Sequence, residues 1–220
     1  HYLKFDTAKN NEIIEIEYRV RDVKGNWHWL LSRDTIFTRT AGGKPKQILG
    51  AASDITSRKK TEEQLRLSER AIAASSNGIV ISDARLEDHP VVFVNPAFEK
   101  ITGYSASEII GKNSRFLQGA DYDQPGLERL RAAFKNQESC TVVLRNYRKD
   151  GSLFWNELNV SPIYDDQGNI THFLGIQNDV TESKLAEERL RKQIKREPLI
   201  KTLTQLHFGL FAIANINPIA

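Results

Sequence analysis

The sequence is poor in sulfur. Among its 220 residues there is no methionine and a single cysteine, Cys140. One cysteine excludes a disulfide framework within the chain and any cysteine pair at a metal-binding spacing, so a reducing, cytoplasmic compartment fits. The five histidines are scattered with none paired at a metal-ligand spacing, and we expect each to be a surface or hydrogen-bonded residue. Because the initiator methionine is missing, we expect a fragment of a longer protein.

Long apolar runs and a strong charge imbalance are also missing. No segment reaches the roughly eighteen consecutive apolar residues of a membrane-spanning helix, and no signal peptide opens the chain. The 31 basic and 28 acidic residues leave a net charge of +3, and no Lys/Arg block alternates with aromatic residues. The sequence therefore predicts neither a membrane nor a nucleic-acid partner. Its 40% hydrophobic and 27% charged residues are typical of a globular protein with one large or two small domains.

Two stretches of the chain repeat. Residues 19–29, RVRDVKGNWHW, recur as 145–155, RNYRKDGSLFW, and residues 49–56, LGAASDIT, recur as 174–181, LGIQNDVT. In each copy, alternating residues flank glycine-containing turns, a pattern typical of three antiparallel strands. The first copy lacks the segment that precedes the second. We therefore expect its sheet to be partly exposed, mobile or completed by a partner chain.

A charged helical segment follows each copy, over 56–74 and from 181 to about 195. Asp54 and Asp179 stand where an N-cap residue would lie. Such helices often link domains to one another or to an effector, and a homodimer through them is an open alternative. A solvated helix packed on its own domain is also open, because residues such as Leu65 and Ile72 form only a thin apolar seam.

Residues 76–180 contain the elements of a complete small domain. The runs Ile79–Asp83 and Val91–Asn95 predict a hairpin, and Pro96 can open a short helix after it. Further helices are expected over Ser107–Ile110 and Gln124–Phe134. Three more strands are expected to begin near Cys140, Leu153 and Ile170.

The segment Gly111–Gly119, GKNSRFLQG, resembles the flavin-binding motif GxNCRFLQ of LOV domains, the blue-light-sensing branch of the PAS family. The resemblance continues through Asn77–Asp83, Phe154–Asn156 and Phe173–Gln177. It implies an α+β PAS fold with a five-stranded antiparallel sheet and flanking short helices. The implied domains are the C-terminal half of a PAS domain (1–57), a linker helix (58–75), a LOV-like domain (76–180), and an exit helix and tail toward an effector (181–220).

The resemblance implies a flavin site whose pyrimidine edge is met by amides. Asn146, Asn156 and Gln177 match these family positions, and amides suit a ring edge that carries both acceptors and a donor. In the first copy these positions are taken by side chains without a hydrogen-bonding group: Val20, Leu30 and Ala52. Residues 1–57 are therefore expected to bind no flavin.

The remaining family positions concern the other end of the flavin. Arg115 and Arg131 match arginines that bind phosphate, which favours FMN and leaves riboflavin and FAD open. Asn113 and Gln118 match residues around the ribityl chain.

Ser114 occupies the family position of the cysteine that adds to the flavin in light. A serine hydroxyl is a far weaker nucleophile at neutral pH, so no cysteinyl-flavin adduct is expected. Cys140 is expected to be a small, partly buried strand residue and no substitute for that cysteine.

The predicted function is therefore a flavin-binding photosensory or redox-sensory input domain of a larger signalling protein, whose effector is a histidine kinase or similar. A PAS protein-interaction or small-ligand sensing module without flavin is the alternative. A flavoenzyme is disfavoured, because no substrate site or catalytic base is evident.

Overall fold

The computed structural model describes residue 5, residues 8–9 and residues 11–194. The chain divides into two compact units, His1–Ala71 and Ile72–Ala220.

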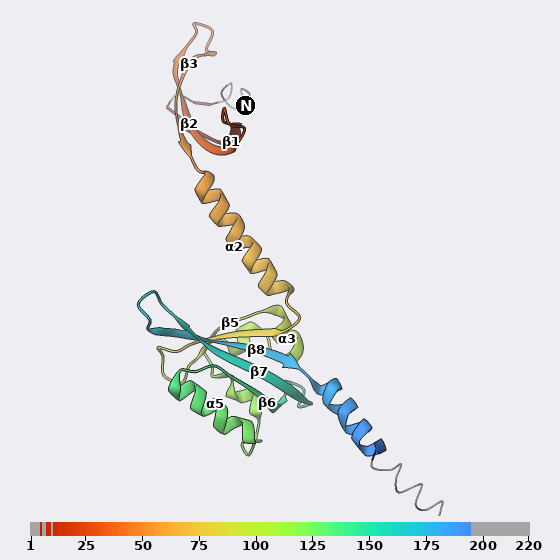
Figure 1. Ribbon diagram of the computed structural model, residues 1–220. Coiled ribbons are helices and arrows are strands. Elements are labelled where there is room, and N and C mark those ends of the chain that lie inside the picture. Colours follow the sequence, from red (N-terminus) through yellow and green to blue (C-terminus); the bar gives the residue numbers. More distant parts are fainter. Residues whose placement is uncertain (1–4, 6–7, 10, 195–220) are drawn as a thin grey trace, which may run out of the picture. The chain divides into compact units, whose positions relative to one another are not determined.

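The first unit is a three-stranded antiparallel sheet in the order β1-β2-β3 (Figure 1). Its strands are β1 (Ile14–Arg21), β2 (Trp27–Arg39) and β3 (Pro45–Asp54). Ile14 and Ile36 form a small buried cluster with Phe5 and Ala8. Strand β3 is exposed at every position after Pro45. The predicted meander is thus present, and its last strand is open to solvent.

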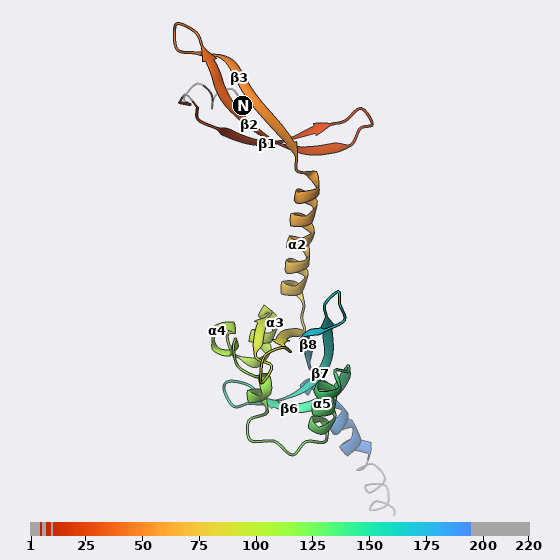
Figure 2. The same cartoon turned by 90° about the vertical axis from the view of Figure 1, so that its left-hand side faces the viewer.

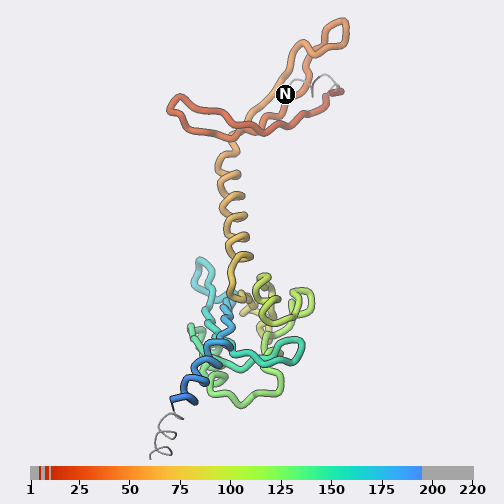
Figure 3. Tube along the Cα trace, turned by 90° about the vertical axis from the view of Figure 1, so that its right-hand side faces the viewer, coloured from red at the N-terminus to blue at the C-terminus, as the bar shows by residue number. Residues whose placement is uncertain are grey.

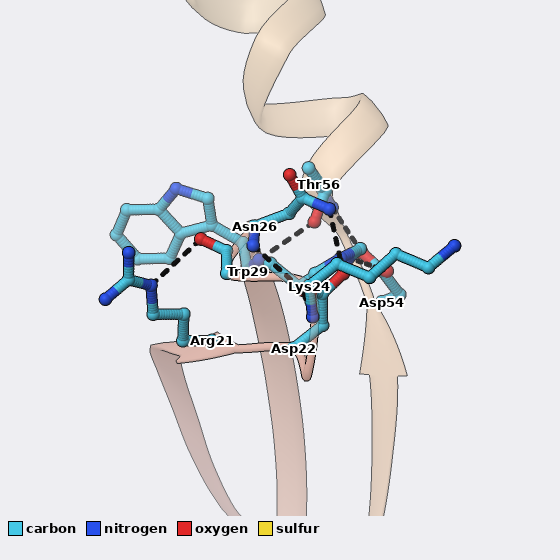
Figure 4. Close-up of polar contacts among 9 residues, drawn as sticks. Arg21, Asp22, Lys24, Asn26, Trp29, Asp54 and Thr56 are labelled. Atoms are coloured by element: carbon cyan, nitrogen blue, oxygen red, sulfur yellow. Dashed lines mark hydrogen bonds and ion pairs between the residues drawn. The ribbon is translucent and has the colours of Figure 1, made fainter.

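Helix α2 (Thr56–Ala74) follows β3 and has the predicted bounds. Its start is tied to the sheet, because the Trp29 backbone N–H donates to Thr56 Oγ1 at 2.8 Å (Figure 4). The Thr56 N–H in turn donates to Asp54 Oδ1 at 2.8 Å. The prediction that Asp54 is the N-cap is therefore wrong by one position, because Ile55 directly precedes the helix, but Asp54 still satisfies a free N–H of the first turn. None of the side chains of α2 is buried.

The second unit holds a five-stranded antiparallel sheet in the order β5-β4-β8-β7-β6 (Figure 1). The strands are β4 (Gly78–Asp83), β5 (Val91–Val94), β6 (Cys140–Tyr147), β7 (Leu153–Tyr164) and β8 (Ile170–Asp179). Between β5 and β6 lie α3 (Pro96–Thr102), α4 (Ala106–Ile109), the 3-10 helix η1 (Ser114–Gln118) and α5 (Pro125–Asn136). The predicted α+β class and five-stranded antiparallel sheet are confirmed.

Asn95 fixes the start of α3. Its Oδ1 accepts the Phe98 N–H at 3.0 Å, and Pro96 fills the first helical position, where no backbone N–H is needed. Its amide group also donates to the carbonyls of Ile72 and Asn77, each at 3.0 Å. One buried side chain therefore joins the end of α2 to the helix after the hairpin.

The helical elements cover one face of this sheet (Figure 2). One buried cluster joins β4 and β5 to α3, α4 and η1 through Val80, Val91, Val94, Phe98, Ile109 and Leu117. A second joins α5 to β6, β7 and β8 through Leu127, Leu130, Val142, Leu144, Val160 and Phe173. The predicted apolar side of α5 therefore packs onto the sheet, and the candidate site lies on this covered face.

A helix over 181–194 follows β8 (Figure 3). Its junction repeats that of the first unit, because the Trp155 N–H donates to Thr181 Oγ1 at 2.8 Å and the Thr181 N–H to Asp179 Oδ1 at 3.0 Å. The rest of the predicted tail, 195–220, lies outside the described residues.

The two junctions differ in the cation beside the aspartate. Asp179 pairs with Arg148 at 2.6 Å, whereas Asp54 pairs with His28 Nδ1 at 3.0 Å. The other ring nitrogen of His28, Nε2, lies 3.3 Å from Asp22 Oδ2. Asp22 also shapes the β1–β2 turn, since its Oδ1 accepts the N–H groups of Lys24 and Asn26 (Figure 4). The first junction can therefore titrate near neutral pH and the second cannot.

We expect His28 to titrate above its ordinary pKa of 6.5, because hydrogen bonds with Asp54 and then Asp22 raise its pKa. A raised pKa in the folded state gives stabilisation that is complete below about pH 6.5 and is lost as the pH rises through the raised value. An NMR titration of the His28 ring should show the raised pKa, and Asp54→Asn should lower it. Asp179→Asn, at the equivalent junction, is the matched control and should leave it unchanged. A His28 pKa at or below 6.5 would contradict the assignment.

Candidate functional site

Two adjoining cavities lie on the covered face of the second unit. The smaller, of about 50 Å³, is bounded by β4, β6, β7, β8, η1 and α5. The larger, of about 410 Å³, is bounded by η1, α5 and the segment after β4. They share the lining residues Ser82, Ser114, Gln118, Leu130 and Phe134. The two cavities therefore form one continuous candidate site.

Three amides lie at the sheet end of this site, as the sequence predicts. Asn146 of β6, Asn156 of β7 and Gln177 of β8 are 3%, 1% and 2% exposed and all line the smaller cavity. Asn156 Nδ2 donates to Asn146 Oδ1 at 2.8 Å, and Asn146 Nδ2 donates to the Arg145 carbonyl at 3.0 Å. Within the described residues, Asn156 Oδ1 and Gln177 Oε1 are buried without a partner. Two buried acceptors that lack a partner in the described chain therefore belong to residues of the same small cavity.

Buried polar atoms without a partner cost free energy, on the order of 1–3 kcal/mol each. Native proteins rarely keep two such atoms side by side unless a ligand satisfies them. The acceptors and the amide N–H groups beside them suit a heterocycle whose edge carries N–H and carbonyl groups. The residues present therefore fit the pyrimidine edge of a flavin.

Gly175 of β8 leaves room on the same face. A Cβ atom there would lie 2.8 Å from Val80 Cγ1 and 3.5 Å from Leu158 Cδ1. All three residues line the smaller cavity, so a side chain at 175 would displace its wall.

Helix η1 presents the polar residues of the motif to both cavities. Ser114 and Gln118 line both, and Asn113 and Arg115 line the larger one. Asn113 caps η1, because its Oδ1 accepts the Arg115 N–H at 2.8 Å. Residue 114 is thereby held between the two cavities, at the first position of η1.

Arg131 of α5 also lines the larger cavity and has no ion pair among the described residues. Arg115 does have one, with Asp88, and its Nε lies 3.2 Å from Asn113 Oδ1. Both predicted arginines thus line one cavity, and one of them, Arg115, is paired with a carboxylate, that of Asp88.

His89 is a residue of this site that the sequence reasoning missed. It lines the larger cavity, and its Nδ1 is buried without a partner among the described residues. Its ring stacks on Phe134 with centroids 5.9 Å apart and meets the edge of Phe173 at 5.5 Å. The expectation that every histidine is exposed or hydrogen-bonded is therefore wrong for His89. Its position at the end of the polar insert Arg85–His89 gave no signal of this contact.

Cys140 lies at the first position of β6, as expected, and lines neither cavity. It packs against the cluster that contains Leu127 and Val160. Burial raises the pKa of its thiol, which keeps the thiol protonated and weakly nucleophilic.

The first copy has the same strand register without the amides. Val20 pairs with His28 as Asn146 pairs with Phe154, and Leu30 pairs with Asp54 as Asn156 pairs with Asp179. Ala52 pairs with Ser32 as Gln177 pairs with Leu158. The alignment of the two copies is therefore confirmed at each amide position.

Two other kinds of feature are absent from the described part of the chain. No helix there combines the length and apolar character needed to cross a membrane. Nor does any group of three or more His, Cys, Asp or Glu side chains lie close enough to hold a metal ion.

Comparison with known proteins gives consistent matches. A family described as "PAS domain" matches residues 76–182. The Bacterioopsin transcriptional activator of Halobacterium salinarum is 41% identical over 155 residues, which are 70% of this chain and 22% of that protein. Blue-light-activated histidine kinase 1 of Erythrobacter litoralis is 42% identical over 137 residues, 62% of this chain and 37% of that protein. The chain spans less than half of the length of either relative.

A solved structure described as "Flavin Analogue Sheds Light on Light-Oxygen-Voltage Domain Mechanism" is 39% identical. The match covers 58% of this chain and 94% of that one, with a TM-score of 0.50. The match therefore covers nearly the whole of that chain at 39% sequence identity. It is consistent with the motif at Gly111–Gly119 and with the order of the strands. The chain therefore belongs to the PAS family, whose domain matches residues 76–182, and to its LOV branch.

Proposed function

We propose that residues 76–180 bind a flavin, FMN in the first instance, and act as a photosensory or redox-sensory input domain that forms no cysteinyl adduct. The observation that carries this proposal is the pair of buried acceptors, Asn156 Oδ1 and Gln177 Oε1, that have no protein partner in the described residues. A flavin supplies blue-light absorption and reversible redox chemistry when bound.

Different residues of the site would bind different parts of the flavin. Asn146, Asn156 and Gln177 would meet the pyrimidine edge, and Leu130, Leu144 and Phe173 would exclude water from it. Asn113 and Gln118 would contact the ribityl chain. Arg115 and Arg131 would bind the phosphate, for which their planar forks are suited.

Ser114 would contact the flavin without attacking it. It lines both cavities, which supports a contact between residue 114 and the ligand like that of the family motif. The hydroxyl stays protonated at neutral pH and is a poor nucleophile. Cys140 is outside both cavities and does not replace it.

Gln177 would pass a change at the flavin to the exit helix. It lies on β8 two residues before Asp179, on the same face, and Asp179 holds Thr181 at the start of the helix over 181–194. A primary amide can exchange donor for acceptor by turning over, so protonation of the ligand would change its preferred orientation. Strand β8 lies between β4 and β7, which couples that change to the sheet.

An effector would receive the signal in the full-length protein. The matched relatives carry names of a transcriptional activator and a histidine kinase. We propose an effector of the histidine-kinase type or similar, with self-association through the charged helices as an additional route.

Replacing Ser114 by cysteine tests the proposed position of residue 114. The thiol is more acidic and more nucleophilic than the hydroxyl, so Ser114→Cys should bleach reversibly in blue light and recover in the dark. The unmodified chain should show no such adduct bleaching. Absorption spectra before and after illumination measure both. Ser114→Thr is the matched control and should not bleach. A cysteine variant that binds flavin and never bleaches would contradict the placement.

Replacing an amide by its counterpart from the first copy tests the pyrimidine edge. Asn156→Leu copies Leu30 and should weaken flavin binding by roughly 5- to 150-fold, because the ligand would be left with an unpaired buried group. In the unliganded variant the orphaned Asn156 Oδ1 is removed, but the buried Asn146 Oδ1 loses its donor, Asn156 Nδ2, so the melting temperature should change little. Titration with FMN and thermal melting of the unliganded protein measure the two effects.

Asn159→Leu makes the same substitution on the opposite face of β7, where Asn159 Nδ2 donates to Thr141 Oγ1. Flavin affinity should be unchanged in this control. Equal losses in the two variants would show that the effect comes from β7 itself and would contradict the assigned role of Asn156.

A further inference from the structure

The carboxylate of Asp88 forms an ion pair with Arg115, one of the two arginines proposed to bind the flavin phosphate. Asp88 Oδ1 forms an ion pair with Arg115 Nη2 at the mouth of the larger cavity. Arg131, the other arginine of that cavity, has no ion pair among the described residues. An incoming phosphate would therefore find one arginine open and one already paired.

The backbone holds Asp88 in this place. Asn113 Nδ2 donates to the Asp88 carbonyl. The Val91 N–H donates to the Lys112 carbonyl at 2.9 Å, and the Gly111 N–H donates to the Val91 carbonyl at 2.8 Å. The polar insert Arg85–His89 and the strand after it are thus bonded to the segment that carries Arg115 at two places, at Asp88 itself and at Val91.

The backbone conformation of the insert Arg85–His89 also holds Asp88 beside Arg115. Asp88 has φ of +66° and His89 has φ of +44°, in the left-handed region that non-glycine residues rarely adopt. Aspartate tolerates this region better than most residues. The positive φ values reverse the chain so that Asp88 faces Arg115 while His89 enters the cavity.

The effect of this ion pair on phosphate binding follows from the charges of the groups involved. A phosphate monoester carries about −1.5 to −2 charges at pH 7. Arg115 and Arg131 together supply two positive charges, and Asp88 cancels one of them. The side chains of Arg115 and Asp88 are 62% and 53% exposed, so water weakens their ion pair and a ligand can compete for the guanidinium. The phosphate would gain less from Arg115 than an unpaired arginine would give.

We propose that Asp88 is a specificity-determining residue of the flavin site, which lowers the preference of the pocket for phosphorylated flavin over riboflavin by competing for Arg115. This inference rests on the proposed flavin-binding function. Asp88 leaves the amides of the pyrimidine edge untouched, because it lines neither cavity. It therefore changes the discrimination between flavins rather than the ability to bind one.

A competition experiment tests the proposal. The whole chain is equilibrated with an excess of equimolar riboflavin and FMN, and the bound flavins are released and quantified by chromatography. Asp88→Asn removes the charge and keeps a residue that tolerates positive φ. The ratio of bound FMN to riboflavin should rise about fivefold, the scale of an exposed ion pair. Asp88→Gly, which also accepts the positive φ, should give the same rise if the asparagine variant does not fold.

Glu87→Gln is the matched control, because it removes the same charge one residue earlier. Glu87 has no ion pair or side-chain hydrogen bond among the described residues, so the ratio should not change. Arg115→Gln should lower the ratio and abolish the effect of Asp88→Asn in the double variant.

An unchanged or lower ratio in Asp88→Asn would overturn the proposal, since Asp88 would then be neutral or would position Arg115 for phosphate. Equal rises in Asp88→Asn and Glu87→Gln would also overturn it, by assigning the effect to net charge. Failure to bind either flavin would instead contradict the proposed function. The two failures are therefore distinguishable.

Discussion

Two buried amide oxygens with no partner in the described part of the chain set the central constraint on the second unit. Asn156 Oδ1 and Gln177 Oε1 lie on the neighbouring strands β7 and β8 and line a cavity whose other walls are largely apolar. Each costs free energy while it is unsatisfied. A sheet that retains both is adapted to hold a polar ligand rather than to be as stable as possible. The short helices, η1 and α5 then serve to close the space in front of these atoms.

Comparing the two copies of the repeat shows which features belong to the shared scaffold and which belong to the candidate site. Both copies share the strand register, the tryptophan that donates to a threonine, and the aspartate that holds the start of the following helix. They differ at the amide positions, where the first copy has Val20, Leu30 and Ala52. The junction to the helix is therefore a property of the fold, whereas the amide cluster is specific to the second copy. A signal generated at the amides would leave through a junction that does not depend on them.

Local patterns in the sequence predicted most of the fold. The bounds of α2 and the starts of β6, β7 and β8 followed from helical composition, alternation and glycine turns, which act over a few residues. The amide positions could be predicted because the internal repeat and the family motif place them in register. The contacts of Asp88 and His89 could not. They depend on positive φ values in a polar insert and on packing against η1 and α5, about 25 to 45 residues away, and no periodic pattern encodes such contacts.

The flavin content of the purified chain tests the central claim most directly. Flavin released by denaturation would be quantified against protein, after saturation with FMN and removal of the excess. The account predicts one flavin per chain, retained when residues 76–182 are expressed alone and absent from residues 1–57. Two flavins per chain would contradict the distinction between the two copies. A chain that remains colourless after saturation with FMN would contradict the flavin site itself.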